Sequence, residues 1–131
     1  MKLKLQNQYH CPEGTWRGVC ETIFEPKRTM NHERDQQVRL RFIVDTDEGE
    51  KKVARSFRAE LSVGGELYEF LNSWLGGDLE WLLDEDGQID LDLLIGEKAD
   101  LQIVHGRQDA QYRFPVVLID KICPPGRLIE R

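Results

Sequence analysis

The sequence predicts an all-β domain with one helix, in the order β-β-β-α-β-β of a five-stranded OB-fold-like barrel. Five segments have the composition or the alternation of strands, and helical spacing of apolar residues falls between the third and the fourth. A length of 131 residues suits a single domain. An immunoglobulin-like sandwich would need about seven strands, and a ferredoxin-like fold would need a helix directly after the first strand. Both agree less well with this order.

The first strand is expected over residues 15–25, where the run TWRGVCETIFE is rich in β-branched and aromatic residues. Gly18 inside this run indicates a bulge or a close approach of another part of the chain. Pro26 ends the strand, because proline has no N–H to donate to a ladder, and a polar loop follows.

The second and third strands form a predicted hairpin over residues 37–45 and 51–61. In the second strand, apolar residues alternate with Arg39 and Arg41, so one face is buried and the other carries arginines. The turn DTDEGE between the strands holds Gly49, which tolerates a positive φ. The third strand places Val53 and Phe57 on one side and Lys52, Ala54, Ser56 and Arg58 on the other.

One helix is expected over residues 66–75, because its apolar residues recur at helical spacing and Gly76-Gly77 follows as a stop signal. The helix should plug one end of the barrel. The residues expected to do so are Leu67, Phe70, Leu71 and Trp74.

The helix is followed by an acidic segment, residues 78–92, that has seven Asp or Glu among fifteen residues and Trp81 as its expected apolar anchor. The last two strands are expected over residues 99–105 and 112–122. Pro115 inside the final strand predicts an edge position or a bulge.

The chain is expected to consist of a loose lead-in over residues 1–13, one domain over residues 14–126 and a tail over residues 127–131. No apolar run suits a membrane span or a secretory signal, and the three cysteines include no close pair. These features predict a cytoplasmic protein in a reducing compartment. The formal net charge is −6, although residues 1–58 carry +3 and residues 59–131 carry −9.

Catalytic and metal-binding patterns are missing from the sequence. There is no P-loop, G-x-S-x-G, H-E-x-x-H or dinucleotide motif, and no His or Cys pair has the spacing of a zinc site. When the acidic segment is aligned with an EF-hand loop, Leu82 and Leu93 stand at the first and last ligand positions, so calcium binding is not expected. The sequence therefore predicts neither an enzyme nor a metal or cofactor site.

Short motifs occur along both halves of the chain in an order that can be compared with that of known proteins. The C-terminal half has Leu94-Ile95-Gly96, a strand from Leu101 to His105, the aromatic residues Tyr112 and Phe114, and an end at Ile122 to Pro124. The N-terminal half has Gly14 and Trp16, then Arg55-Ser56-Phe57, then the helix from Leu67 to Leu71. This order resembles OB-fold proteins of phages and prophages, usually described as single-stranded-DNA-binding or recombination-associated. The resemblance spans most of residues 14–126 and implies the fold more strongly than the activity.

Basic residues cluster on the second and third expected strands, where OB folds commonly bind single strands. They could form a track for a phosphate backbone, or a solvated face that protects a sheet edge. The candidates are Arg39, Arg41, Lys52, Arg55 and Arg58, with Lys51 beside them and Lys27 and Arg28 at one rim.

Bases of a single strand also need flat rings on which to stack. The candidate rings are Trp16, Phe24, Phe42, Phe57, Tyr112 and Phe114. Most of these fall on apolar faces and are expected in the core. Trp16 and Tyr112 are favoured for stacking, because they stand near polar neighbours where strands begin.

The leading hypothesis is a non-enzymatic OB-fold module that binds single-stranded nucleic acid, in the first place DNA, with little sequence preference. The alternative is an OB-type scaffold that contacts other proteins through its helix and the acidic segment. One contiguous basic groove would favour nucleic acid, and arginines neutralised by residues 84–92 would favour the scaffold.

Overall fold

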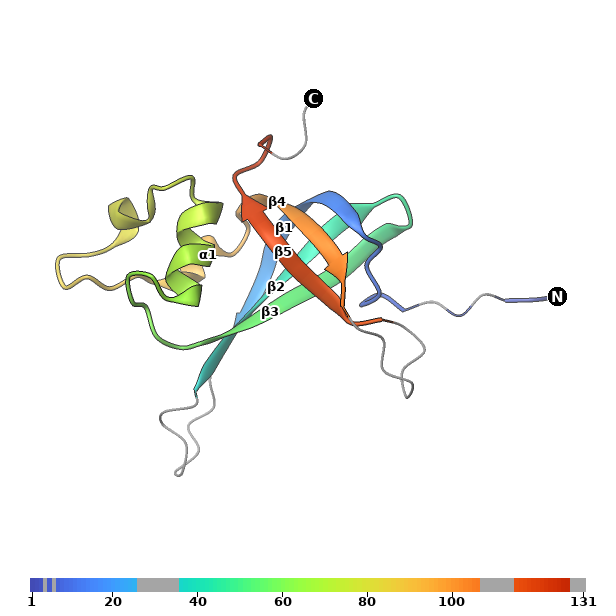
Figure 1. Ribbon diagram of the computed structural model, residues 1–131, viewed down its shortest axis with the longest axis horizontal. Coiled ribbons are helices and arrows are strands. Elements are labelled where there is room, and N and C mark those ends of the chain that lie inside the picture. Colours follow the sequence, from blue (N-terminus) through green and yellow to red (C-terminus); the bar gives the residue numbers. More distant parts are fainter. Residues whose placement is uncertain (4, 6, 26–35, 107–114, 128–131) are drawn as a thin grey trace.

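The computed structural model describes residues 1–3, 5, 7–25, 36–106 and 115–127. Its strands form one antiparallel sheet in the order β3-β2-β1-β4-β5, with the helix between the third and the fourth strand of the sequence (Figure 1). The predicted order of elements is confirmed. The elements are β1 (Gly14–Phe24), β2 (Gln37–Thr46), β3 (Gly49–Arg58), α1 (Glu66–Trp74), β4 (Lys98–His105) and β5 (Val117–Cys123).

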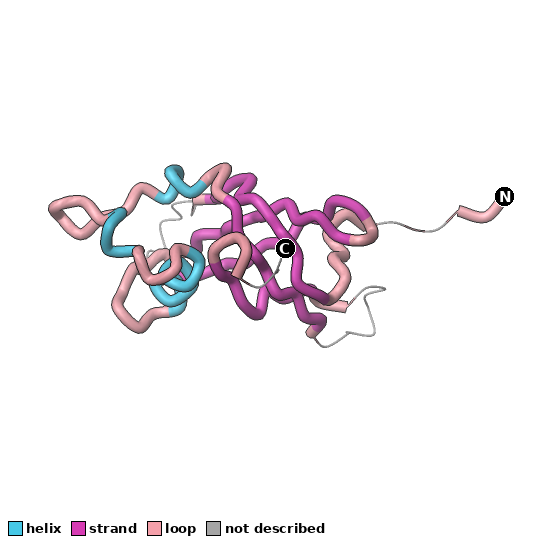
Figure 2. The backbone as a smooth tube through the Cα atoms, turned by 90° about the horizontal axis from the view of Figure 1, so that it is seen from above, coloured by secondary structure: helices cyan, strands magenta, loops and turns pink. Residues whose placement is uncertain are grey.

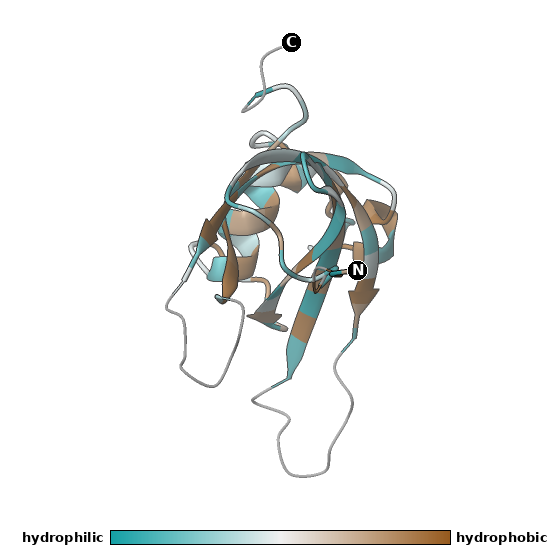
Figure 3. Cartoon of the chain, turned by 90° about the vertical axis from the view of Figure 1, so that its right-hand side faces the viewer, coloured by the Kyte–Doolittle hydropathy of each residue, from teal (hydrophilic) through white to brown (hydrophobic). Residues whose placement is uncertain are grey.

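The sheet curls until its two edge strands approach each other. Some Cα atoms of β3 and β5 come within 8 Å, although the ladders that join the described residues do not pair these two strands. Figure 3 shows the curved sheet from the end opposite the helix, which lies behind the strands in this view. The result is a half-barrel of OB-like architecture, which confirms the predicted fold class.

Two strand boundaries differ from the expectation by three or more residues. Strand β5 begins at Val117, and Pro115 lies before it, while residues 112–114 of the expected strand lie outside the described residues. Strand β5 is an edge of the sheet, where a nearby proline is tolerated. Strand β3 ends at Arg58, because the chain then turns tightly and the N–H of Glu60 donates to the carbonyl of Arg58 at 2.7 Å.

Gly18 marks a close approach, as the sequence indicates. A Cβ at this position would lie 2.7 Å from Val44 Cγ1 and 2.9 Å from Leu101 Cδ1. The bulge of β1 lies further along, where the register shifts between Cys20 and Thr22 and leaves Glu21 as the extra residue.

Helix α1 plugs the barrel as predicted, and its four expected apolar residues are all buried. The ring centroid of Phe42 on β2 lies 5.2 Å from that of Trp74 and 6.3 Å from that of Phe70. Hydrogen bonds fix the helix to the last two strands: Ser73 Oγ donates to the carbonyl of Ile122 at 2.6 Å, and Trp74 Nε1 donates to that of Lys98 at 2.9 Å. No helix among the described residues has the length and apolar character needed to cross a membrane.

The acidic segment lies at the helical end of the barrel (Figure 2). Two 3-10 helices, η2 (Leu79–Leu82) and η3 (Leu91–Leu94), lie in or next to this segment. Leu79 is fully buried in the first turn, whereas Trp81 is 86% exposed, so the expectation that Trp81 anchors the segment is wrong. Residues two apart in a 3-10 helix point in different directions, and the inward position of Leu79 turns Trp81 outward.

The segment before β1 is more closely attached to the barrel than its sequence indicates. Cys11 is fully buried, and the carbonyl of Gln8 accepts a hydrogen bond of 2.8 Å from the N–H of Lys52. This bond occupies one donor on the free edge of β3.

Candidate nucleic-acid interface

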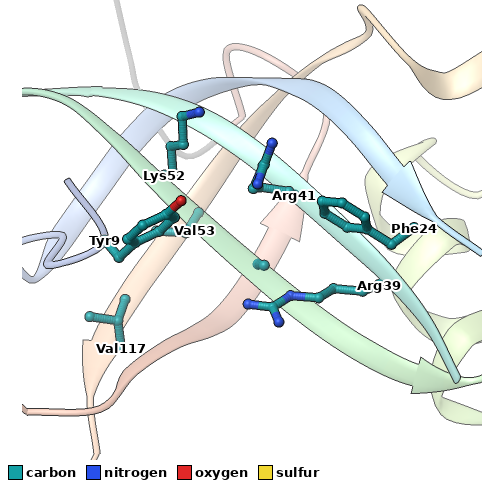
Figure 4. Close-up of a pocket in the computed structure, with 8 residues that line it drawn as sticks. Tyr9, Phe24, Arg39, Arg41, Lys52, Val53 and Val117 are labelled. Atoms are coloured by element: carbon teal, nitrogen blue, oxygen red, sulfur yellow. The ribbon is translucent and has the colours of Figure 1, made fainter.

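A groove of about 640 Å³ runs beside β3 and brings basic and aromatic side chains together. In Figure 4, Arg41 and Phe24 lie to one side of this strand, and Tyr9 and Val117 lie to the other. The residues that line the groove are Tyr9, Phe24, Arg39, Arg41, Lys52, Val53, Ala54 and Val117.

The three cations share the outer face of the sheet because of strand register. Arg39 stands opposite Ser56, Arg41 stands opposite Ala54, and Lys52 stands opposite Ile43. Their neighbours Leu40 and Phe42 point to the opposite face and are fully buried, so the apolar pattern of β2 holds the arginines outward. Three of the five predicted basic residues therefore meet in one groove.

Two of these cations are paired with Glu21, the extra residue of the β1 bulge. Arg41 Nε lies 2.9 Å from Glu21 Oε2, and Lys52 Nζ lies 3.3 Å from Glu21 Oε1. Arg39 is exposed and has no salt bridge within the described ranges. The salt bridges of the groove thus involve Glu21 and not the acidic segment.

Phe24 is an exposed aromatic residue of the groove, and its assignment to the core is wrong. Its side chain is 43% exposed, and the guanidinium carbon of Arg41 lies 4.9 Å from its ring centroid. The bulge explains the error, because one extra residue inverts the alternation of β1 beyond Glu21. Ile23 then faces Leu40 on the inner side, and Phe24 stands opposite Arg39 on the outer side.

Tyr9 is a second exposed ring of the groove, and nothing in its local sequence points to this role. It is 50% exposed, and its N–H donates to Asn7 Oδ1 at 2.9 Å in a local turn. The bond from Lys52 to Gln8 joins this turn to β3 and thereby places the ring beside the cations.

Arg55 lies on the opposite face of β3 from the other candidates. It stands opposite the buried Leu40, and its guanidinium carbon lies 4.7 Å from the ring centroid of Phe57 and 5.5 Å from that of Phe70. Its predicted place in one basic track with Arg39 and Arg41 is therefore not what the structure shows.

Arg58 and Lys51 also lie apart from the groove. Arg58 is on the outer face near the end of β3, where its Nε is 3.4 Å from Glu60 Oε2 and it lines a different hollow. Lys51 stands opposite the buried Val44, and its Nζ donates to the carbonyl of Asn7 at 3.5 Å.

Of the two predicted stacking residues, the structure describes only Trp16, which does not line the groove. Trp16 is half-buried against the core, and its Nε1 donates to the carbonyl of Pro12 at 2.8 Å. Tyr112 lies outside the described residues, as do Lys27, Arg28 and Phe114.

The thiols of the barrel have the properties of core groups. Burial raises the pKa of both Cys11 and Cys20 to about 11, so both thiols are protonated at neutral pH and are weak nucleophiles. Among the residues whose positions are described, no group of three or more His, Cys, Asp or Glu is arranged to hold a metal ion.

Comparison of the chain with protein-family models, with curated proteins and with solved structures gave no match.

Proposed function

We propose that the protein is a non-enzymatic OB-like module that binds single-stranded nucleic acid, in the first place DNA, with little sequence preference. The observation that supports this proposal is the convergence of three cations and two exposed aromatic rings in one groove. The motif resemblance favours a cytoplasmic role in phage replication or recombination.

Each part of the groove matches one chemical feature of a single strand. Arg39, Arg41 and Lys52 offer charge and N–H donors to phosphate oxygens. The rings of Tyr9 and Phe24 offer faces to unpaired bases, and such stacking contributes about 1–3 kcal/mol for each base. Phosphate contacts and stacking hardly depend on base identity, so we expect weak sequence preference.

The net charge of −6 does not prevent this binding. Charges separated by more than about 8 Å are largely screened at physiological salt. The acidic segment is at the helical end of the barrel and would favour a strand that runs away from that end (Figure 1).

Fluorescence anisotropy with labelled oligo-dT at several salt concentrations tests the proposal. Three groove cations should give a log–log slope of about −2, because each phosphate neutralised on a single strand contributes about −0.7. The variant Arg39→Ala/Arg41→Ala should weaken binding and flatten the slope by about 1 to 1.5.

A matched variant, Lys98→Ala/Lys121→Ala, removes the same charge from exposed residues of β4 and β5 outside the groove. It should bind almost as the unchanged protein does. No binding at about 50 mM salt and tens of micromolar protein would overturn the proposal, and equal losses in the two double variants would show that the groove is the wrong surface.

A protein-binding scaffold is the second candidate, and one observation favours it. Trp81 is 86% exposed within a segment that has seven acidic residues and no basic residue, and exposed aromatic residues are enriched in protein interfaces. A basic partner protein would match this surface, which involves none of the residues of the groove.

A further inference from the structure

We propose that Glu21 competes with phosphate for the cations of the groove and thereby sets the affinity for single-stranded nucleic acid. The inference rests on the proposed function and adds to it a residue that weakens binding.

The β1 bulge holds Glu21 in the competing position. Immediately before it, the N–H of Cys20 donates to the carbonyl of Glu97 at 2.9 Å, and the carbonyl of Cys20 accepts from Gly96 at 2.8 Å. Immediately after it, Thr22 is paired with Arg41 on β2. Because the backbone is fixed on both sides, the carboxylate is positioned before any ligand arrives.

The carboxylate of Glu21 contacts both Arg41 and Lys52, which are two of the three cations that a phosphate would use. The side chains of Glu21, Arg41 and Lys52 are only 27%, 23% and 27% exposed, so solvent screens their interactions less than it does at a fully exposed site. An entering phosphate must therefore share these cations with a fixed negative charge.

The effect of removing that charge follows from Coulomb's law. For a phosphate about 6 Å from the carboxylate and an effective dielectric constant of about 40 to 80, Glu21→Gln should raise affinity about threefold to tenfold. The gain should be larger at about 50 mM salt than at about 200 mM salt, because salt screens the repulsion.

A structural role for Glu21 predicts a different result. If the carboxylate only neutralised Arg41 and Lys52 within the sheet, Glu21→Gln would lower the midpoint of thermal unfolding without any gain in affinity. Measuring affinity and thermal unfolding on the same variant separates the two roles.

The experiment compares the full chain with Glu21→Gln and Glu85→Gln in oligo-dT anisotropy at both salt concentrations. Glu85 is an exposed residue of the acidic segment, so its substitution makes the same change of charge outside the groove. The proposal expects the unchanged protein to bind, Glu21→Gln to bind more tightly, and Glu85→Gln to bind about as the unchanged protein does.

Two results would overturn the proposal. The first is that the unchanged protein binds oligo-dT, and Glu21→Gln either binds no more tightly or gains no more affinity than Glu85→Gln does. In that case Glu21 does not compete with phosphate, although the protein still binds nucleic acid. If the unchanged protein does not bind, the proposed function fails and the inference fails with it.

Discussion

Replacing Phe70 with alanine should lower the free energy of unfolding by about 3–5 kcal/mol, because a buried aromatic residue leaves both lost transfer energy and a cavity. Phe70 is 5% exposed where the helix meets the barrel. Its ring centroid lies 4.8 Å from that of Phe57 and 6.3 Å from that of Phe42, so neither strand β2 nor strand β3 can fill the space without moving. The upper half of this range applies if the barrel does not collapse into the cavity.

Urea unfolding followed by circular dichroism measures this loss. With an m-value of about 2 kcal/mol/M, the midpoint should fall by about 1.5–2.5 M. The control Val63→Ala changes a side chain that is 84% exposed, and it should stay within about 0.5 kcal/mol of the unchanged protein. If Phe70→Ala does not fold, Phe70→Leu should fold and lose about 1–1.5 kcal/mol or somewhat more. A loss below about 1 kcal/mol for Phe70→Ala would refute the claim that the helix plugs the barrel through this ring.

Two further predictions concern the groove and its surroundings. Phe24→Ala should weaken oligo-dT binding by about 1–3 kcal/mol with little change in the salt slope, because stacking is lost while Arg39 and Lys52 stay in place. In the anisotropy assay, a dissociation constant within twofold of that of the unchanged protein would contradict this prediction. Arg55→Ala should leave the salt slope of binding unchanged, and it should lower the free energy of unfolding by about 0.5–2 kcal/mol because its contacts with the two rings are lost. If it instead flattens the salt slope as much as a substitution of Arg41 does, Arg55 acts in the groove.

Periodicity along the chain was sufficient to predict the fold. The alternation of β2 and the helical spacing from Leu67 to Trp74 are local patterns, and burial of one face follows directly from them. The OB-like architecture could then be predicted, because a helix between the third and the fourth of five strands along the chain is the order of that fold.

The composition of the groove was only partly predictable. Arg39, Arg41 and Lys52 follow from the alternation of their strands, and the same rule applied to β3 places Arg55 with Val53 on the inner face. Phe24 could not be placed, because the bulge that turns it outward has no glycine or other sequence signal at Glu21.

The remaining features of the site depend on contacts between distant parts of the chain. Tyr9 reaches the groove through the bond between Gln8 and Lys52, and no local pattern reports a contact of that kind. The same holds for Glu21, whose partners Arg41 and Lys52 lie on two other strands.

NMR can locate the surface of the protein to which a single strand binds. In a titration of ¹⁵N-labelled protein with oligo-dT at low salt, we expect the largest shift changes at the Nε–H groups of Arg39 and Arg41 and at the amides of Tyr9, Phe24 and Lys52. Residues 79–94 should change little. Shift changes concentrated at residues 79–94, or no changes at saturating oligo-dT, would contradict the claim that the groove beside β3 binds single-stranded nucleic acid.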